Sequence, residues 1–204
     1  MDPNLLGELH IAVLLISLLV WIAKARTIRM STSTASILAA KVSFWGIAGS
    51  RGFHCLDYWD FYGSAIWKIF DPSIGGLSLW GAFLAGTVAL IIYGRGLEIG
   101  VLRLADATVL PVATGYLIGK IGWAVIGAPP AAMATDYPWG VAHEVNMVSE
   151  AIDVAVGQLM TVHPVVIYEF LWAIVIYAIL LFSIKFTLIP GMRFIQLVSG
   201  LASG

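Results

Sequence analysis

The sequence predicts an all-α protein, a polytopic integral membrane helix bundle. Of its 204 residues, 60% are hydrophobic and only 11% are charged, and the mean hydropathy is +0.92. These values are typical of polytopic membrane proteins and lie outside the soluble range. Several apolar runs also reach about 20 residues, the length that a helix rising ~1.5 Å per residue needs to cross a bilayer. We therefore expect one transmembrane domain over residues 1–204.

Five apolar segments qualify as membrane spans, at about residues 5–23, 34–49, 77–93, 107–128 and 164–186. The first is followed by Lys24 and Arg26, whereas a cleaved signal peptide carries its basic residues before the apolar run, so we expect a retained helix. The charge of Lys41 makes the second segment a weaker match to a membrane span than the others. The third carries small residues typical of a helix-packing face, namely Gly81, Ala85 and Gly86.

The fourth span has a single cation, Lys120, in its middle. A lysine at that depth costs roughly 2.5 kcal/mol or more unless it finds an anion or a polar cavity. We expect it to contact a phospholipid headgroup or a carboxylate, with Glu169 of the fifth span as the best protein candidate. Asp106 stands near the start of this helix, where the helix dipole favours an anion. Three glycines at helical spacing predict a smooth face that another backbone can approach: Gly115, Gly119 and Gly122.

The basic residues near the span ends predict the orientation. Two of them, Arg51 and Lys68, fall on one side, and the others fall on the opposite side: Lys24, Arg26, Arg29, Arg95, Arg103, Lys185 and Arg193. The side richer in basic residues is the cytoplasmic one. The N-terminus is therefore predicted outside and the C-terminus in the cytoplasm, with external loops at about residues 50–76 and 129–163. Residues 190–204 could begin a sixth span, but as given they are too short to cross.

Composition excludes several function classes. The net charge of −1 and the absence of runs of like charge argue against nucleic acid as a partner. The single cysteine, Cys55, cannot form an internal disulfide. His54, Asp57 and Asp60 could suggest a metal site, but one histidine near two carboxylates in a loop is more typical of a solvated cluster. We predict neither a metal nor a cofactor.

Ordered motifs between about Phe44 and Gly191 resemble a known family. Gly75 and Gly76, followed by Ser78, Trp80 and Gly81, are similar to the Gly-Gly-x-Ser-x-His-Gly segment of prolipoprotein diacylglyceryl transferases, which use phosphatidylglycerol to lipidate a cysteine on secreted proteins. Further matches are Gly49-Ser50-Arg51, Asp106 with Pro111 and Gly115, Gly119-Lys120 with Gly122, Thr135-Asp136 with Pro138-Trp139-Gly140, and His163-Pro164 with Tyr168-Glu169. The resemblance implies that fold, a bacterial cytoplasmic membrane, a phosphatidylglycerol-like partner, and Lys120 and Arg51 as phosphate-binding residues.

The departures from the family fall where its chemistry is done. Trp80 replaces the motif histidine, and tryptophan cannot accept a proton. Lys120 replaces an arginine in Gly-Arg-x-Gly-Asn-Phe-x-Asn-Gly-Glu, and it lacks the planar fork that grips phosphate. Val166 replaces a glutamine. The sequence therefore assigns no catalytic residue and leaves open whether the chain is an enzyme.

Three functions follow from the residues and the resemblance. The first is phospholipid binding with the transferase activity lost or altered. The second is a non-catalytic structural subunit of a larger membrane complex, which eight tryptophans and small-residue helix faces would suit. The third is an active diacylglyceryl transferase.

Overall fold

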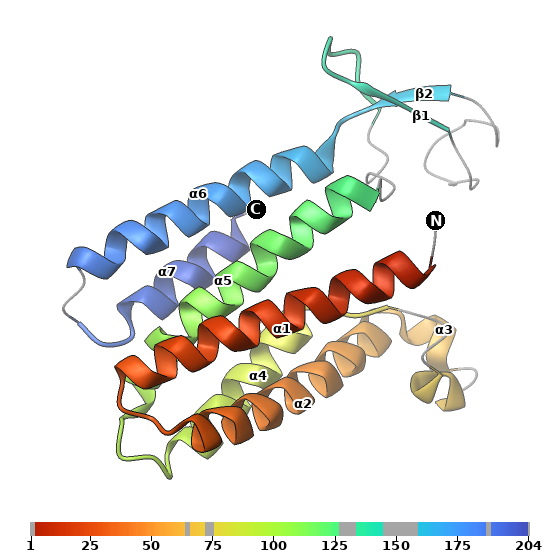
Figure 1. Ribbon diagram of the computed structural model, residues 1–204. Coiled ribbons are helices and arrows are strands. Elements are labelled where there is room, and N and C mark those ends of the chain that lie inside the picture. The colour runs from red at the N-terminus through yellow and green to blue at the C-terminus, as the bar shows by residue number, and fades with distance from the viewer. Residues whose placement is uncertain are drawn as a thin grey trace. The chain divides into compact units, whose positions relative to one another are not determined.

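The computed structural model describes residues 3–63, 66–71, 76–126, 134–144, 159–186 and 189–203. It confirms the prediction of a helical fold (Figure 1). The helices are α1 (Pro3–Thr27), α2 (Thr32–Asp57), α3 (Trp59–Gly63), η1 (Ile66–Phe70), α4 (Leu79–Gly94), α5 (Val101–Ile126), α6 (Val165–Phe186) and α7 (Met192–Ala202), and two short strands are β1 (Val141–Glu144) and β2 (Leu159–Val162).

The chain divides into two compact units. Unit 1 comprises Met1–Ile16, Val112–Phe186 and Gln196–Gly204, and unit 2 comprises Ser17–Pro111 and Thr187–Ile195. The helices α1, α5 and α7 each contribute residues to both units.

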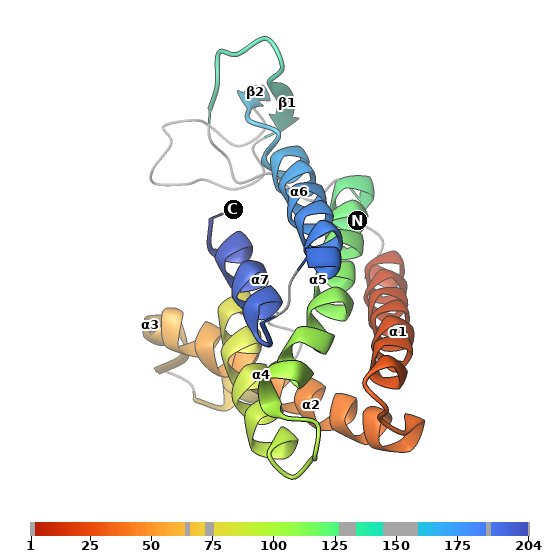
Figure 2. The ribbon, with the colours of Figure 1, turned by 90° about the vertical axis from the view of Figure 1, so that its left-hand side faces the viewer.

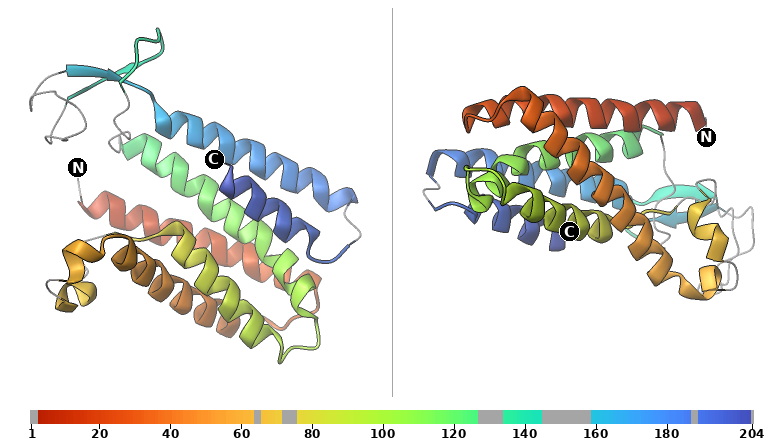
Figure 3. Two further views of the ribbon diagram at one scale, coloured as in Figure 1. Left: turned by 180° about the vertical axis from the view of Figure 1, so that it is seen from behind. Right: turned by 90° about the horizontal axis from the view of Figure 1, so that it is seen from below.

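In unit 2, α2 and α4 lie side by side (Figure 3). They touch through small residues, because a Cβ at Gly81 would overlap the Gly49 carbonyl oxygen and the Phe53 side chain. A Cβ at Gly49 would overlap Ala85 in turn. The predicted packing face on the third span is therefore confirmed.

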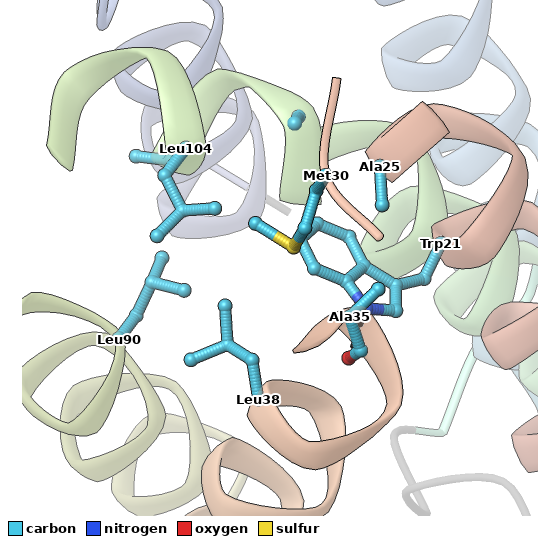
Figure 4. Close-up of a cluster of buried hydrophobic side chains, with 9 residues drawn as sticks. Trp21, Ala25, Met30, Ala35, Leu38, Leu90 and Leu104 are labelled. Atoms are coloured by element: carbon cyan, nitrogen blue, oxygen red, sulfur yellow. Dashed lines mark hydrogen bonds between the residues drawn. The ribbon is translucent and has the colours of Figure 1, made fainter. Parts of the chain in front are cut away.

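A buried apolar cluster holds α1, α2, α4 and the start of α5 together in unit 2. Figure 4 shows Trp21, Ala25, Met30, Ala35, Leu38, Leu90 and Leu104 converging on one core. The buried indole N–H of Trp21 donates to the Ala35 carbonyl over 2.8 Å. This bond satisfies the one polar atom that the tryptophan brings into the core.

In unit 1, α6 runs antiparallel to the second half of α5 (Figure 1). The Thr114 hydroxyl of α5 lies 3.4 Å from the Tyr177 hydroxyl of α6. Further along α5, Lys120 contacts Glu169, which comes earlier in α6, as expected for antiparallel helices. The indole of Trp172 donates to the Gly200 carbonyl at 3.0 Å and joins α7 to this pair. The antiparallel strands β1 and β2 lie at the N-terminal end of α6 (Figure 2).

Within the residues that the structure describes, two helical segments are long and apolar enough to cross a membrane, Val101–Gly122 and Val165–Ile184. Large apolar side chains on the helices are also exposed, including Leu19, Val88 and Phe182. Such a surface is rare on soluble monomers and fits a lipid environment.

The boundaries differ from the sequence predictions in several places. Helix α2 continues past Gly49 to Asp57, and α3 and η1 occupy part of the expected loop 50–76. Helix α5 begins at Val101 instead of 107, and the expected loop 129–163 contains β1 and β2. The predicted close approach at Gly119 is wrong for the part of the chain that the structure describes, because a Cβ there would meet no atom within 4 Å.

Candidate functional site

The charged centre of unit 1 is an ion pair between α5 and α6. The Nζ atom of Lys120 lies 2.6 Å from Oε2 of Glu169, as the sequence predicted for a lysine in an apolar span. The two side chains are 22% and 36% exposed, so the pair is neither sealed in the bundle nor fully open. The Lys120 ammonium also lies 5.4 Å from the centroid of the Tyr116 ring, within cation–π range.

One contact with Glu169 uses one of the three N–H donors of an ammonium group. The pair is therefore a partly exposed cation held in place by a carboxylate, with N–H donors that no described residue takes and that can be offered to a second anion.

Aromatic side chains gather where α6 begins. The Trp139 indole donates to the Tyr168 hydroxyl at 2.7 Å, and Nδ1 of His163 lies 3.3 Å from the same oxygen. The Tyr137 ring stacks on Trp139, with centroids 4.8 Å apart and planes 7° apart. Two motifs that are remote in sequence, around Trp139 and around Tyr168, thus meet next to Glu169.

The turn before β1 positions Trp139. The backbone N–H of Thr135 donates to the Thr161 carbonyl at 2.9 Å, and the Thr135 hydroxyl accepts from the Tyr137 N–H at 3.3 Å. A Cβ at Gly140 would overlap Thr161. Tight packing therefore explains why residue 140 is a glycine. The motif residues Asp136 and Pro138 are exposed in the turn.

In unit 2, the glycine-rich motif shapes the start of α4. Gly76 has a φ of 82°, which favours glycine, and a Cβ there would overlap the His54 ring. The Ser78 hydroxyl accepts from the Gly81 N–H at 3.3 Å and caps the helix. Trp80 is exposed and contacts the Phe83 ring edge-on.

Arg51 binds backbone carbonyls of the segment before α4. Its guanidinium donates to Lys68, Ile69, Asp71 and Gly76 at 3.0–3.1 Å. It also lies 5.3 Å from the centroid of the Tyr62 ring. That Arg51 binds lipid phosphate stays a prediction, and these contacts favour a role in holding this segment against α2.

Asp106 caps α7, whereas the sequence predicted that it interacts with the dipole of its own helix, α5. Its carboxylate accepts from the backbone N–H groups of Gly191 at 2.8 Å and Phe194 at 3.2 Å, at the start of α7. A carboxylate at a helix N-terminus satisfies unpaired N–H groups and complements the dipole. The expected interaction with the dipole of its own helix is replaced by a cap on α7.

The comparisons with known proteins decide the family. The family model described as "Prolipoprotein diacylglyceryl transferase" matches residues 8–201. The chain belongs to this family. It is also similar to a phosphatidylglycerol–prolipoprotein diacylglyceryl transferase of Corynebacterium diphtheriae, with 31% identity over 78% of this chain and 59% of the relative. Two further relatives have the same name. The one from Synechococcus elongatus is 30% identical over 72% of this chain, and the one from Clostridioides difficile is 29% identical over 67% of it.

The chain spans about half the length of these relatives, since the alignments cover 59%, 50% and 49% of them. The residues at the family-motif positions of this chain fall into three groups. Gly81 and Gly140 allow close packing, and Asp106 caps α7. The others make polar contacts: Trp139, His163, Tyr168, Lys120 and Glu169. Gly122 is buried, Pro164 is partly exposed, and Gly75 lies outside the described residues. The sequence interpretation missed Tyr116 and Tyr137, although both are aromatic neighbours of motif residues.

Proposed function

We propose that the chain is a phospholipid-binding membrane protein in which the transferase activity of the family is lost or altered. The observation that carries this proposal is the Lys120–Glu169 pair, in which a partly exposed ammonium lies in a long apolar helix. A phosphodiester is the anion that a lipid bilayer supplies in quantity. The names of the relatives point to phosphatidylglycerol, and a similar headgroup is the ligand we propose here.

The proposed loss or change of activity rests on the replaced residues. Diacylglyceryl transfer needs a phosphate clamp, stabilisation of a leaving glycerophosphate, and help in deprotonating a thiol. Lys120 can serve the first need as a point charge. Trp80 cannot take a proton, so the histidine that it replaces has no functional substitute at this position.

The experiment is phospholipid retention by the purified full chain. Nanodiscs of phosphatidylcholine with a minor fraction of phosphatidylglycerol are prepared, and the lipid that remains on the protein is counted by native mass spectrometry. We expect preferential retention of phosphatidylglycerol, with the occupancy of one bound lipid per chain reduced about 10-fold or more in Lys120→Met, because a charge-assisted hydrogen bond contributes ~1.5–3 kcal/mol. Lys120→Arg should retain it.

The matched control is Lys41→Met, which makes the same substitution in another helix. Lys41 lies over the Tyr93 ring at 4.6 Å from its centroid, so it is also a cation in an apolar segment. If Lys41→Met lowers retention as much as Lys120→Met, the effect is one of general charge and the Lys120 site is disproved. Equal retention by the unmodified chain and Lys120→Met would disprove it too.

A further inference from the structure

Unit 2 contains a basic cavity that the proposed lipid site does not use. Thr27, Ile28, Arg29 and Arg103 line a cavity of about 430 Å³. This volume lies within the ~300–1,000 Å³ range of small-ligand pockets. Both arginines are exposed, and among the described residues no carboxylate is within ion-pair distance of either.

The turn from α1 to α2 presents Arg29 in an unusual way. The Met30 N–H donates to the Ala25 carbonyl and the Arg29 N–H to the Arg26 carbonyl, at 3.0 and 3.1 Å. These two bonds form a Schellman motif, in which the residue at Arg29 takes a left-handed conformation that is usually given to glycine. Arg29 has a φ of 61°, the only positive φ of a non-glycine residue in the described ranges.

The backbone at both arginines is anchored by a neighbouring core residue. Met30 follows Arg29, Leu104 follows Arg103, and the two apolar side chains point into the same buried cluster (Figure 4). Arg103 also lies in the first turn of α5, where backbone N–H groups and the helix dipole favour an anion. Two cations, Arg29 and Arg103, therefore line one cavity, and each is next in sequence to a residue of the buried core.

We propose that this cavity is a second anion site, formed by residues other than those around Lys120, and that it binds a phosphate group. The predicted orientation puts this end of unit 2 on the cytoplasmic side. The phosphate could then belong to the headgroup of an anionic phospholipid in the inner leaflet or to a soluble phosphate compound. Arginine suits both, because its fork makes parallel hydrogen bonds to phosphate oxygens.

The test uses the full chain with Arg29→Gly and Arg103→Gln. Arg29→Gly removes the charge but suits the left-handed backbone, so the fold is retained. The control is Arg95→Gln, an exposed cation at the end of α4 that does not line the cavity. All variants are made in the Lys120→Met background, so that loss of the proposed lipid site cannot be mistaken for loss of this one.

Two probes separate the sources of phosphate. Equilibrium dialysis against radiolabelled inorganic phosphate measures a soluble ligand, and native mass spectrometry from phosphatidylcholine nanodiscs with and without phosphatidylglycerol measures a lipid. We expect Arg29→Gly and Arg103→Gln each to weaken binding of one probe at least ~10-fold, with Arg95→Gln unchanged. The probe whose binding is weakened shows whether the phosphate belongs to a soluble compound or to a lipid headgroup. If the parent chain binds neither probe, or if Arg95→Gln weakens binding equally, the proposal is overturned.

Discussion

Replacing Lys120 with methionine leaves the Glu169 carboxylate without its partner at 2.6 Å. Methionine keeps much of the volume and the apolar stem of lysine, so the change mainly removes the charge. We expect a less stable unit 1, because an unpaired carboxylate in an apolar environment costs desolvation energy that the ion pair had offset.

The magnitude follows from the exposure of the pair. Removing one partner of a fully buried pair costs ~3–5 kcal/mol, whereas solvent-exposed pairs contribute ~0–1 kcal/mol. With side chains 22% and 36% exposed, Lys120 and Glu169 fall between these cases, so we expect Lys120→Met to cost about 1–3 kcal/mol. The double variant Lys120→Met/Glu169→Gln should recover most of this loss, because it leaves no unpaired charge.

The assay is reversible unfolding of the purified chain in mixed micelles, with the two single variants and the double variant forming a thermodynamic cycle. The cycle is repeated with phosphatidylglycerol added, since a bound headgroup should stabilise the unmodified chain and not Lys120→Met. A coupling energy below ~0.3 kcal/mol between positions 120 and 169 would refute the reasoning, because independent sites add within about that error.

Four other substitutions test the local geometry. Arg29→Gly should raise stability by about 0.5–1 kcal/mol in thermal melts, since it relieves a left-handed backbone; an unchanged or lower melting temperature contradicts this. Gly81→Ala should cost about 1–3 kcal/mol where α2 and α4 touch, whereas Gly119→Ala should be neutral or stabilising because its Cβ meets open space; equal melting temperatures would show that the contact is misjudged. Asp106→Ala should cost about 0.5–2 kcal/mol and speed hydrogen exchange in α7, while exchange at the wild-type rate would mean that the cap is unimportant.

The sequence predicted the helices α1, α2, α4, α5 and α6 because apolar run length is a strong signal, whereas α3, η1 and α7 are too short to give one. All five predicted spans correspond to helices, and the partner of Lys120 could be named because a cation in an apolar run requires an anion. The boundaries of α2 and α5 were less predictable. Both helices continue into polar sequence, where hydropathy no longer marks a helix but backbone hydrogen bonding continues.

The errors concern contacts between residues remote in sequence. Helical spacing cannot tell that Gly81 touches a neighbouring helix while Gly119 faces open space, since both sit in small-residue patterns. The partner of Asp106 lies in α7, more than eighty residues away, so a local rule assigned it to the wrong helix dipole. The hairpin β1–β2 has strands of four residues, too short for an alternating pattern to be recognised.

Complementation of bacteria depleted of their own prolipoprotein diacylglyceryl transferase tests the central claim most directly. The chain is expressed beside an authentic transferase as positive control, and its amount in the membrane is measured by blotting. We predict that the chain reaches the membrane and does not restore growth or lipidated lipoprotein, because Trp80 and Val166 replace residues of the family motifs. Rescue by the unmodified chain, abolished by Lys120→Met but not by Lys41→Met, would contradict the proposed loss of activity and show a working transferase.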